Sequence, residues 1–558
     1  MKKALLITMM AISLSLTATG CENVLQNTRV GAEADDDDDE KGSKDKKDKK
    51  DKKDKKDKKN KDADDTEDMT AEEKVEQGLE IIYEDKEQAL KLFEEAADEG
   101  NEDAIFLAGY MLGWEGDDFN ALDFEKSIEY MEMVEEDNVY AKISLGFMYY
   151  YGLGCDKDID TSNSYLKSAA KAIDEDAIEG SMYEDIKWLL CGIMYDYGCG
   201  VTVAVDIDKA RECYENSADL GNCVAMNKVG DFYYYGDGVA QDYEKAKEWY
   251  DMAIEYDDST AMNNLGIMYS YGYGVEQDDE ESFKWHKKGA ELGNPTSMCN
   301  VAVMYEDGQG TDVDLDAAFE WYSKAAELYD EVAMNALGDF YLDGKCVDQD
   351  DEKAFEYYMM SAERGYAVGI SNVGYMYEMG YGVEEDIEKA LEWYMKAADE
   401  GSGVAMSNIG NLYYFGEGVE QDYDAAVEWY QKAMDNGDDF AMFYMGVCYE
   451  SGEGVEQDYV KALDYYEKAA DSTGETIAML YAGDMYYFGR GTEQDYEKAF
   501  EWYLQAAELG DDVAMYYVGV AYYNGEGVDE DDDAALEWIQ QAADLGNEDA
   551  IAALDQYF

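Results

Sequence analysis

The chain has 558 residues, of which 46% are hydrophobic, and it carries a formal net charge of −87 with one proline and one histidine. That charge argues against a nucleic acid ligand, because such binding depends on neutralising phosphates with lysine and arginine. One proline over this length favours short continuous helices over a loop-rich β fold, so we predict an all-α chain.

The first twenty residues have the layout of a secretory signal. Two lysines precede an apolar run from Ala4 to Leu16, and small residues lead to Cys21. The small residues are similar to the lipobox of bacterial lipoproteins, which implies cleavage before Cys21 and a lipid on its sulfur. A plain secretory cleavage is the alternative, and the run is shorter than the roughly 20 residues of a membrane span. We predict a signal over 1–20 and an exported chain, lipid-anchored at the cell membrane or outer envelope.

Residues 21–70 are of low complexity. An acidic block, Asp35 to Glu40, precedes a lysine-rich tract from Lys44 to Lys61, with almost nothing apolar to bury. We therefore expect a disordered, solvated tether; the alternative is that its lysines bind anionic lipid or wall polymer. Nearly all of the net negative charge falls in residues 71–558, which favours a basic partner through long-range steering, with solubility as the alternative explanation.

From residue 113 onward the chain returns to one short glycine loop, in most cases every 36 residues. A fixed period of this size is typical of stacked repeats, in which each unit contacts only its neighbours. We predict a solenoid of about twelve helix-turn-helix repeats over 71–558. A degenerate copy at Gly113 and Gly116 comes first, and the loops then begin at Gly152, Gly198, Gly236, Gly272, Gly308, Gly344, Gly380, Gly416, Gly452, Gly489 and Gly525.

Residues 259–292 illustrate one repeat. Helical spacing of apolar residues predicts a first helix, helix A, which stops near Gly272. Asp278 is placed to cap the second helix, helix B, and Gly293 to end it. The only proline supports this register, because Asn294 and Pro295 suit the N-cap and first position of the next helix.

Two columns recur with the loops. We predict that the tryptophans of helix B form the wedge between helices rather than a ligand platform. A glycine within helix A lowers helix propensity, so its recurrence predicts close helix packing. Residues 71–98 and 547–557 should close the ends. The tryptophans are Trp249, Trp285, Trp321, Trp393, Trp429, Trp502 and Trp538, and the glycines are Gly146, Gly230, Gly266, Gly338, Gly374, Gly410, Gly446, Gly483 and Gly519.

Several columns together carry a family resemblance. The pattern Ala405-x-x-x-Ile409-Gly410, with its loop at Gly416 to Asp422 and Trp429-Tyr430 in helix B, resembles the Sel-one-like repeat family, relatives of tetratricopeptide repeats. The resemblance covers roughly residues 100–545. It implies a right-handed α/α superhelix that serves as an adaptor or scaffold for proteins, in bacteria often at the envelope or host interface. Departures are Cys346 at the end of one loop, Ala302 at a helix-A glycine and a longer unit near residues 174–183.

In tetratricopeptide-like arrays helix A lines the concave face, so a ligand would meet its non-core stripe. The column two residues before the helix-A glycine offers amides, which can bond an extended peptide backbone, and then tyrosines. Either this column binds a partner or it packs between repeats. Its members are Asn264, Asn300, Asn372, Asn408, Tyr444, Tyr481 and Tyr517.

A second candidate is the aromatic residue directly before each loop. These rings either form a stacking edge for glycan or for a partner's side chains, or they cover the loop from water. The members are Tyr151, Tyr197, Tyr235, Tyr271, Phe415 and Phe488.

The sequence argues against catalysis, a cofactor or a metal. The single histidine, His286, cannot assemble a triad, and we expect it to face solvent. The glycine loops follow helices rather than strands, and Asp312-x-Asp314-x-Asp316 lacks the glycine and glutamate of a calcium loop. Cys191 with Cys199 and Cys213 with Cys223 are the close cysteine pairs, whose disulfide state stays open. We expect a non-catalytic scaffold for a protein or peptide; the alternative is a glycan- or wall-binding envelope protein.

Overall fold

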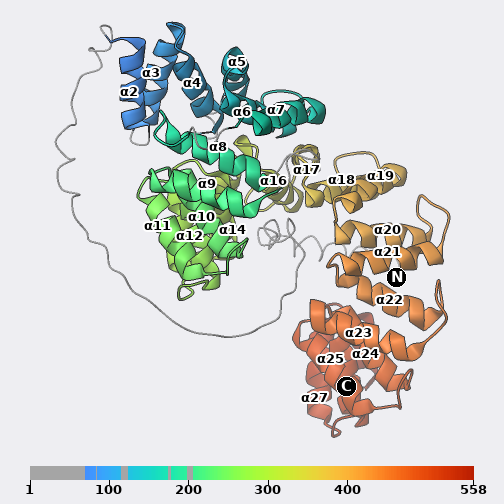
Figure 1. The fold of residues 1–558 in the computed structure, drawn as a ribbon. Coiled ribbons are helices and arrows are strands. Elements are labelled where there is room, and N and C mark those ends of the chain that lie inside the picture. The colour runs from blue at the N-terminus through green and yellow to red at the C-terminus, as the bar shows by residue number, and fades with distance from the viewer. Residues whose placement is uncertain are drawn as a thin grey trace. The chain divides into compact units, whose positions relative to one another are not determined.

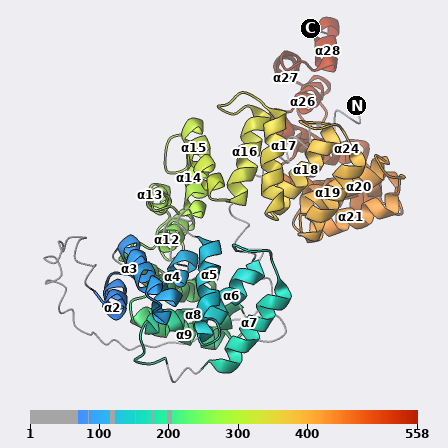
Figure 2. The same cartoon turned by 90° about the horizontal axis from the view of Figure 1, so that it is seen from above.

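The computed structural model describes residues 69–82, 85–114, 123–151, 153–173, 178–197 and 205–557, and every regular element in these ranges is an α-helix (Figures 1 and 2). This confirms the all-α solenoid. The first helices are α2 (Ala71–Ile81), α3 (Lys86–Asp98), α4 (Glu102–Trp114), α5 (Phe124–Val134), α6 (Val139–Tyr151), α7 (Ile159–Ala172), α8 (Glu184–Tyr197), α9 (Ile207–Asp219), α10 (Cys223–Tyr235), α11 (Tyr243–Ile254), α12 (Ser259–Tyr271), α13 (Asp279–Glu291), α14 (Pro295–Asp307) and α15 (Leu315–Glu327).

The chain divides into two compact units, one up to Ala333 and one from Met334, and helix α16 (Glu331–Asp343) contains the division. We call them the N-terminal and C-terminal units. The C-terminal unit continues with α17 (Asp351–Glu363), α18 (Ala367–Met379), α19 (Ile387–Asp399), α20 (Gly403–Phe415), α21 (Tyr423–Asp435), α22 (Phe440–Ser451), α23 (Tyr459–Thr473), α24 (Thr476–Phe488), α25 (Tyr496–Glu508), α26 (Asp512–Asn524), α27 (Asp532–Asp544) and α28 (Glu548–Tyr557).

The helices pair as predicted: within each of the two units, helix A and helix B of a repeat pack as a hairpin, and neighbouring hairpins are in contact. In the example repeat, α12 ends at Gly272, whose left-handed φ of 71° suits glycine. Asp278 caps α13 by accepting a 2.9 Å hydrogen bond from the N–H of Glu281. Asn294 and Pro295 take the predicted N-cap and first position of α14. The turn residues thus fix where each helix begins and ends.

The wedge between helices A and B is not the tryptophan but the residue after it. A Cβ on Gly410 would lie 2.5 Å from Cε1 of Tyr430, whereas Trp429 is only partly buried. The predicted close packing at the glycines is confirmed, and the assignment of the tryptophans as the wedge is wrong. Neighbouring positions on a helix point about 100° apart, so the rotation of helix B presents the second ring to the glycine. We call these second residues the wedge column: Tyr214, Tyr250, His286, Tyr322, Tyr358, Tyr394, Tyr430, Tyr466, Tyr503 and Ile539.

The two ends and the long unit also have identifiable structures. Helices α2 and α3 form the opening pair, and Asn547 caps the closing helix α28. In the long unit, the Tyr183 hydroxyl donates a 2.7 Å hydrogen bond to Asp103, on α4. The predicted signal, Cys21 and the tether up to residue 68 lie outside the described residues. Within the described ranges, no helix has both the length and the apolar character that crossing a bilayer requires.

Candidate functional site

The wedge tyrosines are buried, and each hydroxyl donates to an acceptor on the preceding helix A. The acceptor stands one or four residues after the helix-A glycine position, which places it on the same face of the helix. This row is mostly acidic, so carboxylates line the interior of the helix-A face. The hydroxyl–acceptor distances are 3.4 Å for Tyr214–Asp196, 2.9 Å for Tyr250–Asp231, 3.2 Å for Tyr322–Glu306, 2.6 Å for Tyr358–Asp339, 2.7 Å for Tyr394–Glu378, 2.8 Å for Tyr430–Asn411, 2.9 Å for Tyr466–Glu450 and 2.7 Å for Tyr503–Asp484.

The repeat that contains His286 departs from this rule, as does the last repeat, where Ile539 stands in the wedge column. The side chain is 3% exposed, so the expectation that it faces solvent is wrong. His286 takes the wedge position against Gly266, and Ile267 stands where other repeats place an acceptor. Its Nδ1 lies 3.0 Å from Oδ1 of Asn263. Burial lowers the pKa of His286 to about 4, so the imidazole is neutral near pH 7.

The asparagine column connects successive helices A. Asn264 donates through Nδ2 to Oδ1 of Asn227 at 3.0 Å and to Oδ1 of Asp231 at 3.1 Å. Asn300 and Asn372 donate in the same way across one repeat, to Asn263 at 3.0 Å and to Asn335 at 2.9 Å. Asn264, Asn300 and Asn408 nevertheless stay partly exposed, while Asn372 is buried. The column therefore serves packing between repeats and still presents polar atoms at the surface.

Tyrosines continue this column in the C-terminal unit, where ring contacts replace the amide hydrogen bonds. Tyr444 stacks on the wedge ring of Tyr430, with centroids 5.1 Å apart and planes 7° from parallel. Tyr481 and Tyr517 contact the wedge rings of the preceding repeats at 5.1 Å in each case. Tyr517 is 36% exposed.

The aromatic residues before the loops form exposed clusters in several repeats. Tyr235 is 45% exposed and Tyr271 43%. Tyr271 stacks on Tyr273, which stacks on Tyr243 at 4.9 Å, and Tyr234 contacts Tyr235, Tyr243 and Tyr273. We call these five rings the tyrosine cluster. Phe415 is partly buried against Tyr414, and the side chain of Tyr151 lies outside the described residues.

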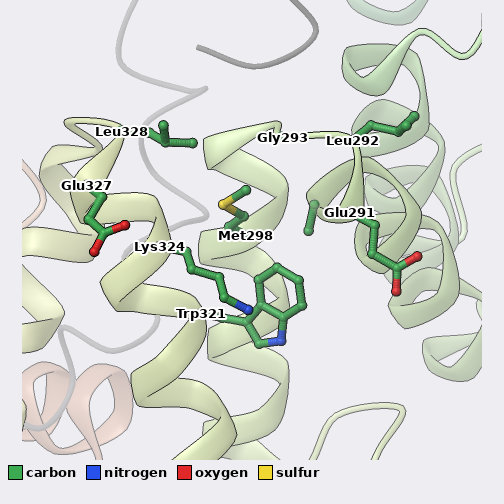
Figure 3. Close-up of a pocket in the computed structure, with 9 residues that line it drawn as sticks. Glu291, Leu292, Gly293, Met298, Trp321, Lys324, Glu327 and Leu328 are labelled. Atoms are coloured by element: carbon green, nitrogen blue, oxygen red, sulfur yellow. The ribbon is translucent and has the colours of Figure 1, made fainter. Parts of the chain in front are cut away.

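A shallow cavity of about 410 Å³ is lined by the end of α13, by α14 and by α15 (Figure 3). Met298 forms its floor, and the ammonium of Lys324 lies 4.0 Å from the ring centroid of Trp321. Glu291 and Glu327 also line it. A lysine on an indole beside two carboxylates makes a surface groove suited to polar contacts.

Within the described ranges, no group of three or more His, Cys, Asp or Glu side chains is arranged to bind a metal ion. Within the acidic stretch at Asp312, Asp314 has a structural role instead. Its carboxylate accepts a 3.0 Å hydrogen bond from the N–H of Ala317 and caps α15. Cys199 lies outside the described residues, while Cys191, Cys213 and Cys223 are buried.

Sequence reasoning named the surface columns but missed the acceptors beneath them. A signal for them exists, since an Asp, Glu or Asn stands one or four residues after the helix-A glycine in most repeats. In five repeats the wedge tyrosine directly follows the tryptophan, so both partners of these hydrogen bonds recur with the loop.

Comparison with known proteins places these repeats in context. The model of the Sel1 repeat family matches residues 75–101, 139–174, 188–222, 223–255, 259–294, 295–330, 332–366, 367–402, 403–438, 439–473, 476–511 and 512–547. The twelve matches confirm the predicted number of repeats. They leave out helices α4 and α5, which still pack as a hairpin where the degenerate copy was expected. The comparison with curated proteins found no match.

Several solved structures are similar to the chain. A protective antigen of uropathogenic Escherichia coli strains with an SLR fold is 28% identical, covering 84% of this chain and 97% of that one, with a TM-score of 0.49. A Sel1 repeat protein from Oxalobacter formigenes is 30% identical, covering 44% and 99%, with a TM-score of 0.41. A protein described as a Sel1 repeat protein from Klebsiella pneumoniae is 22% identical, covering 36% and 98%, with a TM-score of 0.27.

Proposed function

The chain belongs to the Sel1 repeat family, and on this premise we propose that it is an exported, lipid-anchored scaffold that holds a protein or peptide partner on its helix-A face. Repeats of this type generally mediate protein–protein interactions and typically act as non-catalytic scaffolds. Anchoring through Cys21 at the cell envelope is part of the proposal and rests on the N-terminal sequence.

The observation that carries the proposal is the regular, partly exposed polar column on successive helices A. Asn264 and Asn300 use their amide N–H groups between repeats, but their Oδ1 atoms accept no hydrogen bond from the described residues. A carbonyl oxygen repeated along a solenoid suits the N–H groups of an extended chain. Solenoids commonly use such an extended surface for binding.

The charge supports a basic partner. The repeats carry nearly all of the net charge of −87, and carboxylates recur beneath the helix-A face. A field of one sign accelerates encounter with a partner of opposite sign, and rim charges act mainly on the association rate.

Cross-linking of the acyl-anchored full chain in native envelopes, followed by mass spectrometry, tests the proposal. We expect one defined partner, with Asn300→Ala and Asn408→Ala lowering its recovery. Met395→Ala, at an exposed position of helix B in α19, is the matched control and should leave recovery unchanged. Recovery of self-cross-links alone would contradict the scaffold.

The tyrosine cluster favours glycan or wall polymer as a second candidate ligand. Exposed, mutually stacked rings such as Tyr271 and Tyr273 offer flat apolar area with polar tips. This alternative predicts that the full chain co-sediments with isolated cell-wall material and that Tyr235→Ala or Phe415→Ala reduces the bound fraction. If Asn300→Ala reduced it while these two variants did not, the glycan reading would be wrong.

A further inference from the structure

In the C-terminal unit, the guanidinium group of Arg490 is bound between a carboxylate and an aromatic ring of the chain itself. Arg490 follows α24, and its Nη1 donates a 2.9 Å hydrogen bond to Oε1 of Glu450, on α22. Its Cζ lies 5.1 Å from the ring centroid of Phe488. The second oxygen of Glu450 accepts from the wedge hydroxyl of Tyr466 at 2.9 Å. A carboxylate held by a tyrosine thus combines with an aromatic ring, a set that suits the planar cation of arginine.

Helices α18 and α20, which lie two repeats earlier in the C-terminal unit (Figure 1), carry residues equivalent to Glu450 and Phe488. Glu378 on α18 corresponds to Glu450, and its Oε2 accepts a 2.7 Å hydrogen bond from the wedge hydroxyl of Tyr394. Phe415, the last residue of α20, corresponds to Phe488, the last residue of α24. Two of the three components of the occupied site are therefore repeated.

The third component differs, because Glu417 stands where the later repeat has Arg490. The loops match in their backbone hydrogen bonds. The N–H of Glu417 donates to the carbonyl of Leu412 at 3.0 Å, and the N–H of Arg490 donates to that of Met485 at 2.8 Å. The chain thus supplies its own cation at one site and a second carboxylate at the equivalent place.

The carboxyl group of Glu378 lacks an arginine partner of the kind that Arg490 provides to Glu450. It is 7% exposed, and its Oε1 accepts no hydrogen bond from the described residues. Burial raises its pKa to about 7, the hydrogen bond from Tyr394 opposes the rise, and the nearby charge of Glu417 adds to it. A buried carboxylate without a cation is costly, and a bound cation would remove that cost.

We propose that Glu378, Phe415 and Glu417 form a binding site for an arginine side chain of the partner, with the guanidinium placed as Arg490 is at Glu450. The inference rests on the proposed function and names the side chain that the helix-A face takes at this repeat. Arginine fits better than lysine, because its plane packs on Phe415 while its forked donors reach two carboxylates.

Calorimetric titration of the purified full chain with a blocked tri-arginine peptide, at about 0.15 M salt to screen surface charge, tests the site. Glu417→Arg places an internal guanidinium where Arg490 lies in the later repeat, so we expect about tenfold weaker binding of the peptide. Glu428→Arg, at an exposed position of α21, changes the net charge equally and should alter binding less than about twofold. Equal losses in both variants would overturn the proposal.

Two further variants keep the test decisive if Glu417→Arg fails to fold. Glu378→Gln keeps an acceptor for Tyr394 but removes the charge, and it should weaken the peptide as well. Arg490→Ala empties the later site, so the number of bound peptides should rise by one. Unchanged binding to both variants would overturn the site. A cross-linked partner recovered equally with wild type and Glu417→Arg would also overturn it, while leaving the scaffold intact.

Discussion

Gly410 and Tyr430 are in direct contact across the hairpin of α20 and α21, and an added Cβ would lie 2.5 Å from Cε1 of the ring. Gly410→Ala should therefore destabilise the chain by about 1–3 kcal/mol although alanine is the better helix former, because overpacking exceeds the gain in propensity. Urea denaturation of the full chain measures the change. Ala302 stands at the same position against Tyr322, so Ala302→Gly is the matched comparison and should cost only about 1 kcal/mol. A more stable Gly410→Ala variant would contradict the packing described.

The hydroxyls of the wedge tyrosines should stabilise the fold through the hydrogen bonds that they donate. Tyr358→Phe removes the donor of a 2.6 Å hydrogen bond and leaves Asp339 less satisfied, so we expect a loss of about 1–3 kcal/mol in the free energy of unfolding. Tyr358→Phe combined with Asp339→Leu should cost less than the sum of the two single changes. Additive losses in this double-mutant cycle would show that the two side chains act independently.

The repeat that contains His286 allows the tyrosine–acceptor pairing to be tested by building it in. His286→Tyr buries a hydroxyl opposite Ile267 and Ser270, neither of them a carboxylate, and should destabilise the chain by about 1–3 kcal/mol. Adding Ile267→Asp supplies the acceptor that Asp231 provides to Tyr250 and should recover most of that loss. Thermal unfolding of the single and double variants checks this. An Ile267→Asp change that fails to improve His286→Tyr would contradict the pairing rule.

Glu378 should make stability depend on pH. Its pKa is raised to about 7 in the folded chain from an ordinary value of 4.5, so between these values the folded state binds more protons than the unfolded state. Stability contributed by this group therefore falls as pH rises from 4.5 to about 7 and stays low above it. Glu378→Gln should therefore be more stable than wild type across that window, by roughly 3 kcal/mol in the free energy of unfolding at its upper end. Urea midpoints at several pH values test this, and parallel curves for the two proteins would contradict it.

Much of the architecture could be predicted because turn chemistry recurs at fixed places. Gly272 and Asp278 mark helix ends by backbone conformation and capping, which are local properties. Which of Trp429 and Tyr430 is buried depends instead on the rotation of helix B against helix A, a tertiary property that two adjacent aromatic rings do not reveal. His286 was misassigned for the same reason, since its place in the wedge column becomes evident only once that column is identified. The asparagine column was placed correctly on helix A, but its hydrogen bonds depend on the distance between repeats.

Site-specific photo-cross-linking in native envelopes tests the central claim most directly, namely that a protein partner lies along the helix-A face. A photoreactive residue would replace Asn264, Asn408 or Tyr517 on helix A, and Met252 or Met395 at exposed positions of helix B, one at a time. The account predicts that one partner is captured from the helix-A positions and not from the helix-B positions. Capture from helix B alone, or equal capture from both faces, would contradict it.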